Sequence, residues 1–469
     1  MYFDLSKLYW IWGGVIVKKF WSKVLACAVV MTVLGSNSIA IYAKDQGALE
    51  IDHPLDVGMN PKKLHDIEIM MNTAIQAGEI PGGVILVTKD NKVVYHEAFG
   101  YAQLYDMGEK LENPRLMTED AIFDLASVTK VMATTQAIMK LSYEGKLDVD
   151  DPVAKYIPDF AKNGKEKVKL SDLLTHTSGL TPWAPTWYYA SNSQEELTYI
   201  CNLPLEYETG TDRRYSDFSF MTLGFVVEAV AGMPLDQYVE ETIYKPLGMT
   251  DTMYTPDIVL KDRIAATSWG NPYEYKMVAD DNFGYLCEED AENYKGWRDY
   301  TLVGEVNDGN TFYANQGVAG HAGLFSTAND LAKLGQLMLN GGTYNGVTLY
   351  DQETIDKFTS VQSEFGHGYG FEVNRGGENL GYMGIASTEH RFGHTGFTGT
   401  EIIFDKDQNM QVIILTNKQN LGVDQEGYYP GSFRLSRNIM DIVDASLKNA
   451  NLNCDCYCYI HEHQDSSTK

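Results

Sequence analysis

The stretch FDLASVTKVMATT, residues 123–135, decides how this sequence is read. Ser127 opens a segment with helical periodicity, and Lys130 follows three residues later, so the two side chains share one face of the predicted helix. A serine at a helix start lies beside free N–H groups and the positive end of the dipole, and a semi-buried lysine can lose its proton. The pair is a candidate nucleophile and base, and the apolar residues that follow would fix it in a core.

The Ser-x-x-Lys pair alone is weak, because a second copy stands at Ser466–Lys469 and a capping serine with a solvated lysine gives the same pattern. Two further stretches strengthen it. RRYSDFSFMTLG (213–224) places a Tyr-Ser-Asp sequence just ahead of a predicted helix. RFGHTGFTGTEIIF (391–404) places His-Thr-Gly in a predicted strand, among glycines that indicate a close approach to the backbone.

Taken in this order, Ser-Val-Thr-Lys, Tyr-Ser-Asp and His-Thr-Gly resemble the motifs of the serine β-lactamase and penicillin-binding DD-peptidase superfamily. The similarity is greatest to its branch of class C β-lactamases, DD-carboxypeptidases and esterases. It covers about residues 60 to 447 and includes the phrases LLTHTSGL, IYKPLGMTDT, GVAGHAGLFSTANDLAK and LNGGTYNG. The resemblance implies an α+β fold of the β-lactamase/transpeptidase type, with an antiparallel sheet flanked by helices and an inserted, mainly helical subdomain at about 150–260.

The resemblance also implies catalytic roles. Ser127 would attack a carbonyl group and become acylated, and Lys130 would take or relay its proton. Tyr215, made more acidic by nearby cationic groups, would serve the leaving group as acid and base. Whether Lys130 or Tyr215 is the base stays open, and a core tyrosine is the alternative interpretation of Tyr215.

The same resemblance implies the substrate-binding residues. The N–H groups of Ser127 and Phe397 would hold the oxyanion. His394, Thr395 and Gly396 would contact the substrate, and His394 would titrate near neutral pH. His176 and His321 stand in phrases typical of the family; we interpret them as structural, with His321 a candidate for the wall of the cleft.

Asp217 departs from the family pattern, because much of the family has asparagine at this place. A carboxylate only accepts hydrogen bonds, whereas an amide also donates. Asp217 is therefore expected to pair with Lys130, to keep it charged and to disfavour efficient β-lactam hydrolysis. His394, in place of the lysine of most β-lactamases, also favours peptidase or esterase chemistry.

The leading prediction is a secreted serine hydrolase that acts on D-alanyl peptides of the cell wall or on esters, with β-lactams as acylating ligands. A class C-like β-lactamase is the first alternative. A non-catalytic protein that binds or senses peptidoglycan or β-lactams is the second. The sequence predicts no metal and no other cofactor, because the Cys and His residues of the tail match no metal-site spacing.

Periodicity places further elements. Helices are predicted over residues 63–77, 221–230, 235–243 and 433–447. Hairpins are predicted around Asp90-Asn91 and around residues 405–409. The weakly patterned stretch at about 268–318 is predicted to be a surface excursion.

Composition and the two ends complete the prediction. A net charge of −27 argues against nucleic acid as a partner. Residues 1–43 read as a secretory signal, with an uncleaved membrane anchor as the alternative; residues 1–16 fit this pattern poorly, so translation is expected to start at Val17. A hydrolase domain over 44–450 and an unstructured tail over 451–469 follow, in a protein of the cell envelope or the exterior.

Overall fold

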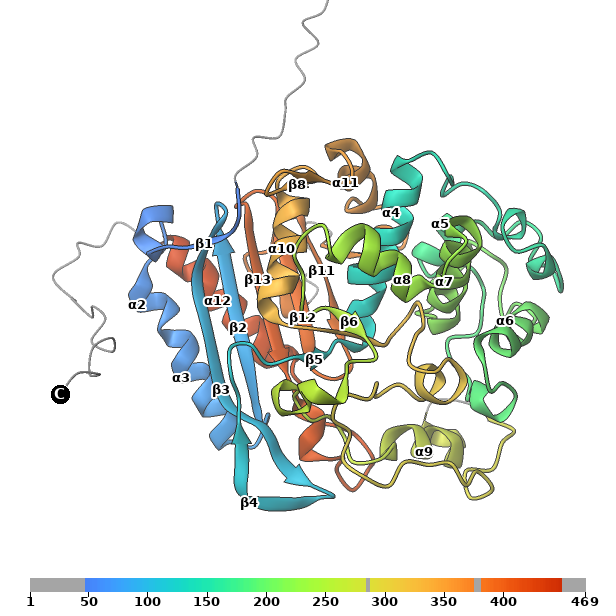
Figure 1. Ribbon diagram of the computed structural model, residues 1–469, viewed down its shortest axis with the longest axis horizontal. Coiled ribbons are helices and arrows are strands. Elements are labelled where there is room, and N and C mark those ends of the chain that lie inside the picture. Colours follow the sequence, from blue (N-terminus) through green and yellow to red (C-terminus); the bar gives the residue numbers. More distant parts are fainter. Residues whose placement is uncertain (1–46, 284–286, 375–380, 449–469) are drawn as a thin grey trace, which may run out of the picture. The chain divides into compact units, whose positions relative to one another are not determined.

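The computed structural model describes residues 47–283, 287–374 and 381–448, which belong to one compact unit starting at Asp45 (Figure 1). The predicted signal segment (1–43) and the predicted tail (451–469) lie outside the described residues. Within the described part of the chain no single helix is long and apolar enough to cross a membrane. One bent pair of helices, Asp217–Ala231 and Leu235–Tyr244, passes that test by length and composition alone.

The centre of the unit is a sheet of eight strands in the order β1-β3-β2-β13-β12-β11-β10, with β4 paired to β3. All pairs are antiparallel except β1 with β3. The first half of the sheet comes from the start of the unit and the second half from its end, as the two predicted hairpins require. The strands are β1 Glu50–Ile51, β2 Gly82–Lys89, β3 Lys92–Asp106, β4 Glu109–Leu116, β10 Glu372–Val373, β11 Arg391–Gly396, β12 Thr400–Asp405 and β13 Met410–Thr416.

Helices cover both faces of this sheet. They are α2 Pro61–Leu64, α3 Asp66–Gln76, α4 Thr135–Tyr143, α5 Leu170–Leu174, α6 Ser193–Asn202, α7 Asp217–Ala231, α8 Leu235–Val239, α9 Pro272–Ala279, α10 Ala328–Leu339, α11 Gln352–Phe358 and α12 Phe433–Lys448. Two small sheets complete the described fold: a three-stranded sheet in the order β5-β7-β6 and the pair β8-β9, with the strands β5 Phe123–Asp124, β6 Met253–Tyr254, β7 Leu324–Ser326, β8 Thr343–Tyr344 and β9 Val347–Thr348. The segment between residues 150 and 260 is mainly helical, as predicted.

The two faces of the sheet are set by alternation along β2. Ile85 and Val87 point into a core shared with α3 and α12, whereas Val84 and Leu86 point into a larger core shared with α4, α7 and α10. Figure 1 shows α3 and α12 beside each other along the sheet, and α10, α4, α7 and α8 on the side that carries the helical segment. The site lies on this second side.

The predicted hairpin at Asp90-Asn91 is present, and both residues have positive φ (51° and 64°), as a two-residue turn with the twist of the strands needs. The helix predicted to start at Ser127 differs from expectation. Its first turn, Ala126–Val128, is a 3₁₀ helix, the next, Lys130–Thr134, is a π-helix, and only Thr135–Tyr143 is α-helical.

Candidate active site

Ser127 stands on a tight turn between β5 and the helix. Ala126 has a φ of 45°, a left-handed conformation that costs a residue with a Cβ about 1 kcal/mol or more. The side chain of Asp124 holds the turn, because its carboxylate accepts hydrogen bonds from the backbone N–H groups of Ala126 (2.9 Å) and Asn307 (2.6 Å). Burial raises the pKa of Asp124 to about 6. The turn thus fixes where the Ser127 hydroxyl points.

The start of β12 and the end of β11 are bonded to the same turn. Thr398 and Thr400 donate hydrogen bonds to the carbonyls of Asp124 (2.7 Å) and Leu125 (2.9 Å). A Cβ on Gly396 would lie 2.4 Å from the Leu125 carbonyl oxygen, so only glycine permits this approach. Phe397, whose N–H is predicted to complete the oxyanion hole, therefore lies between two anchored residues.

Lys130 is completely buried, and three oxygen atoms surround its ammonium group. These are Ser127 Oγ at 2.9 Å, Asp217 Oδ1 at 2.8 Å and the His321 carbonyl oxygen at 3.1 Å. Burial alone would lower the pKa of Lys130, but Asp217 and Tyr215 outweigh it and raise the pKa. Lys130 is therefore fully buried and not semi-buried, and Asp217 keeps it charged, as was expected from the carboxylate at that position.

Tyr215 precedes α7, and Lys130 Nζ lies 4.8 Å from the centre of its ring. Its pKa is raised and not lowered as the sequence suggested: burial and Asp217 act against ionisation and outweigh the effect of Lys130. The site thus holds its two candidate proton carriers, Lys130 and Tyr215, both in the protonated form.

His176 positions the Tyr-Ser-Asp turn. Its Nδ1 accepts a hydrogen bond from the Ser216 N–H (3.0 Å), and its ring lies 4.4 Å from the ring of Tyr215. The Ser216 hydroxyl also donates to the Thr181 carbonyl (2.8 Å) and caps α7 through the Ser219 N–H. The structural role predicted for His176 is thus visible as contacts that orient Tyr215 and Asp217.

His394 lies on β11 with 1% of its surface exposed. Its Nδ1 is 2.7 Å from the Thr395 carbonyl oxygen; since a carbonyl only accepts, Nδ1 carries the proton and Nε2 is an acceptor. Burial, with Lys130 nearby, lowers the pKa of His394 to about 3. The expectation that it titrates near neutral pH is therefore wrong, and the side chain is a neutral imidazole.

A cavity of about 230 Å³ opens beside Ser127. Tyr215, Asp217 and Phe397 line it, together with residues that no sequence motif marks as functional, foremost Asp308 and Glu274. His321, suggested as a cleft residue, also lines it. No short motif marks Asp308, because its place depends on a bond to His321, thirteen residues away.

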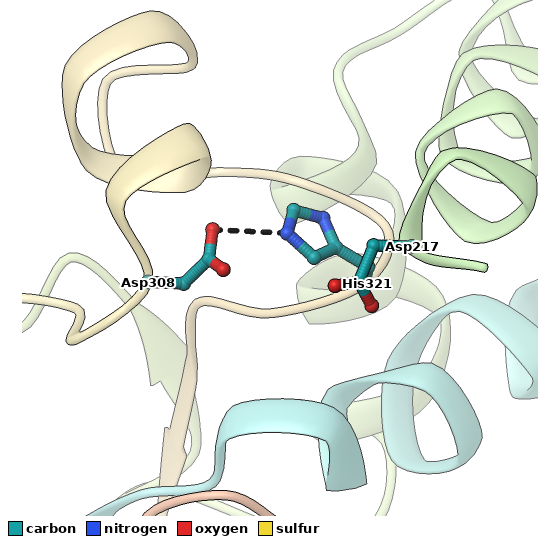
Figure 2. Close-up of side chains that lie close together, drawn as sticks. All are labelled: Asp217, Asp308 and His321. Carbon is teal, nitrogen blue, oxygen red and sulfur yellow. Dashed lines mark hydrogen bonds and ion pairs between the residues drawn. The ribbon is translucent and has the colours of Figure 1, made fainter. Parts of the chain in front are cut away.

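Figure 2 shows Asp308 and His321 joined by a hydrogen bond of 2.9 Å from Nε2 to Oδ1, with Asp217 on the other side of the imidazole. One oxygen of each carboxylate and one nitrogen of His321 lie within 4.8 Å of one another, a donor set that suits a divalent cation. These donor groups already have partners within the protein, since Asp217 pairs with Lys130 and His321 pairs with Asp308.

The stretch at 268–318 is more than the predicted surface excursion. It contributes Met277, Val278, Phe283 and Ala291 to a separate core with Trp183 and Trp187. It also supplies Tyr273, Glu274 and Asp308 to the cavity wall. The prediction failed because this core is assembled from aromatic contacts between distant segments and leaves no periodicity in the sequence.

Comparisons with known proteins identify the family of this chain. The family model described as "Beta-lactamase" matches residues 70–430. A protein of Salmonella agona (strain SL483) named "Putative D-alanyl-D-alanine carboxypeptidase" is 37% identical over 423 residues, which are 86% of this chain and 94% of that protein.

Solved structures show the same fold. A penicillin-binding protein homologue from Caulobacter crescentus superposes with a TM-score of 0.61 at 21% identity, covering 83% of this chain and 99% of that one. EstCE1, described as a hydrolase with promiscuous acyltransferase activity, gives a TM-score of 0.60 at 22% identity, covering 81% and 98%. The fold is thus of the β-lactamase/transpeptidase type, and the chain belongs to the β-lactamase family as a serine hydrolase.

Proposed function

We propose that this hydrolase works through an acyl-enzyme on Ser127 and that its substrates are D-alanyl peptides of the bacterial cell wall, from which it releases the terminal D-alanine. The observation that carries the proposal is the distance of 2.9 Å between Ser127 Oγ and the buried Lys130 Nζ, beside a cavity of about 230 Å³. The name of the Salmonella relative supports the choice of substrate.

In the proposed reaction Ser127 Oγ attacks the carbonyl carbon, and its proton passes to the Lys130–Tyr215 pair after that pair has lost one proton. The oxyanion is held by the N–H groups of Ser127 and Phe397. Tyr215 then protonates the leaving amine, and a water molecule reverses these steps to free the acid. Because the pKa values of Lys130 and Tyr215 are both raised, acylation should become faster as the pH rises.

Ester hydrolysis is the second candidate function, and two observations favour it. The described lining of the cavity contains no lysine or arginine that would bind the carboxylate of a terminal D-alanine. His394, which stands where most β-lactamases carry lysine, is neutral. The similarity in fold to EstCE1 is consistent with this alternative.

The test is intact-mass spectrometry of residues 44–469, mixed separately with a penicillin, with p-nitrophenyl acetate and with a D-alanyl-D-alanine peptide, beside Ser127→Ala. A long-lived penicilloyl adduct and D-alanine release, both lost in Ser127→Ala, are expected. Ester turnover without D-alanine release would select the esterase. Fast turnover of a chromogenic cephalosporin would select the β-lactamase, and no acylation by any compound would reject acyl-enzyme chemistry.

We also propose that residues 1–43 export the protein and are removed. The basic and then apolar pattern of that segment supports this. N-terminal sequencing of the protein from an exporting host should find a start close to residue 41 or 44; a protein that keeps its leader and sediments with membranes would indicate the anchor instead.

A further inference from the structure

Aromatic rings form one wall of the cavity beside Ser127. The ring centres of Tyr273, Phe397 and Tyr429 lie 4.8 to 6.0 Å from one another, and Trp183 lines the same space. An aromatic face that contacts a cation attracts it by about 0.5–2 kcal/mol, so a wall of rings is a suitable neighbour for a cationic group. The aromatic wall is an observation separate from the charged residues that line the same cavity.

Asp308 supplies the negative charge. Its Oδ1 accepts hydrogen bonds from the Thr311 N–H (2.7 Å), the Thr311 hydroxyl (2.8 Å) and His321 Nε2 (2.9 Å). Burial would raise the pKa of Asp308, but His321 and these bonds outweigh it, so the pKa is held well below the usual range. None of these three bonds uses Oδ2, and Figure 2 shows one carboxylate oxygen of Asp308 without a dashed bond.

Glu274 braces the loop that carries Asp308. Its two oxygens accept hydrogen bonds from the Gly309 N–H and from Asn271 Nδ2, both 2.6 Å long. Burial, with Asp308 nearby, raises the pKa of Glu274 and favours its protonated form. Asp308, and not Glu274, is therefore the charge that this side of the cavity offers to an occupant.

The separation of the carboxylates suits one ammonium group. An oxygen of Asp217 lies within 4.8 Å of an oxygen of Asp308. Two acceptors of one tetrahedral ammonium at ordinary ion-pair distances would stand about 4.6 Å apart. The described lining contains no lysine or arginine, so Asp308 has no such partner within the cavity, whereas Asp217 would share its charge between Lys130 (2.8 Å) and a substrate amine.

We propose that this cavity binds a primary ammonium group on the acyl part of the substrate, held by Asp308 with help from Asp217 and the aromatic wall. The substrates are then amine-bearing acyl compounds, such as peptides or esters whose acyl chain carries a free amino group. The inference rests on the proposed function, because it assigns a substrate class to acyl transfer at Ser127.

The experiment compares kcat/KM for p-nitrophenyl 6-aminohexanoate with that for its N-acetyl form, and repeats the pair with a glycine ester and N-acetylglycine ester. The wild type is expected to prefer a free amine at least tenfold in one of the two pairs. Asp308→Asn should reduce this preference to less than threefold, and Tyr273→Leu should reduce it in part. Melting temperatures of the variants establish that they are folded.

Asp299→Asn is the matched control, because it removes the same charge from an exposed residue of the same segment outside the cavity lining; its preference should stay that of the wild type. Equal turnover of free and acetylated esters by the wild type would overturn the inference while leaving acyl transfer intact. No Ser127 adduct with any ester would instead reject the proposed function. A preference that EDTA abolishes would assign the carboxylates to a metal ion and overturn the inference.

Discussion

Asp217 raises the pKa of Lys130 and of Tyr215. Each shift reduces the fraction of that side chain that is deprotonated, and so able to act as a base, at neutral pH. Asp217→Asn keeps the shape of the side chain and removes the charge, so both pKa values should fall. We expect the rise of acylation rate with pH to move to lower pH, with the rate at pH 7 higher by about tenfold for each pKa unit of the shift. Stopped-flow acylation by p-nitrophenyl acetate between pH 5 and 10 measures it.

Asp212→Asn is the control, since it removes an exposed carboxylate of the same loop that pairs with Arg214 and not with Lys130. Its pH profile should match the wild type. An Asp217→Asn profile that also coincides with the wild type would show that neither Lys130 nor Tyr215 limits acylation.

His176 gives a second prediction for a single side chain. His176→Phe keeps a ring against Tyr215 but leaves the buried Ser216 N–H without its acceptor, which costs about 1–3 kcal/mol. We expect kcat/KM to fall about tenfold or more as the Tyr-Ser-Asp turn loosens. His176→Asn places an acceptor close to the same position and should recover most of the loss; if it recovers nothing, the hydrogen bond is not what orients the turn.

Site residues that belong to a short sequence motif could be predicted from the sequence. Ser127 and Lys130 come together as their spacing predicted, and Tyr215 and Asp217 join them as the family resemblance implied, including the pairing of Asp217 with Lys130. The raised pKa of Lys130 follows from that expected pairing, whereas the raised pKa of Tyr215 was not predictable, because it depends on the desolvation that the folded site imposes.

Elements of secondary structure were predictable where local pattern and burial agree. The central strands β2 and β13 are buried on both faces, so they stand out in the sequence as short apolar runs bounded by turn residues. The 3₁₀ and π turns around Ser127 were not predictable, because they follow from the left-handed conformation of Ala126. Hydrogen bonds to Asp124 and packing against β11 maintain that conformation.

Gly396 tests how β11 and the Ser127 turn depend on each other. In Gly396→Ala the new Cβ would meet the Thr400 hydroxyl at 2.2 Å and the Leu125 carbonyl at 2.4 Å, so β11 must move away from the turn. We expect acylation to fall at least 100-fold, because a displaced Phe397 N–H no longer faces the oxyanion. Burst kinetics with p-nitrophenyl acetate measure the loss.

Gly431→Ala is the control for this variant, since a Cβ there has no neighbour within 4 Å; its acylation rate should be that of the wild type. If Gly396→Ala keeps at least half of the wild-type rate, the oxyanion is held elsewhere.

At the scale of the whole molecule, the site is assembled from segments that are distant along the chain. Asp124 bonds to Asn307, Lys130 to the carbonyl of His321, and Thr398 to the carbonyl of Asp124. Each motif is local in the sequence and could therefore be predicted. The cavity wall and its charge depend on these long-range bonds and could not be predicted.

The same reasoning extends to the last helix, because Arg391 at the start of β11 is bound to Asp444 on α12. The guanidinium donates a hydrogen bond of 3.0 Å from Nη1 to Asp444. It also donates hydrogen bonds to Asp405 (2.7 Å) and to the Met383 carbonyl (2.8 Å), and all of these groups lie in the core between sheet and helix. Asp444→Asn leaves a buried cation short of one charge, so we expect the free energy of unfolding to fall by about 3 kcal/mol. Urea unfolding followed by tryptophan fluorescence measures the fall. Asp441→Asn, which removes a more exposed carboxylate one turn earlier on α12, should cost about 1 kcal/mol or less. Since β11 continues into His394, Thr395 and Gly396, the folded fraction of Asp444→Asn should still acylate at the wild-type rate.

An Asp444→Asn variant that is as stable as the wild type would show that this ion pair contributes nothing net to the fold. A variant that is stable but inactive would show that α12 sets the geometry of the site directly.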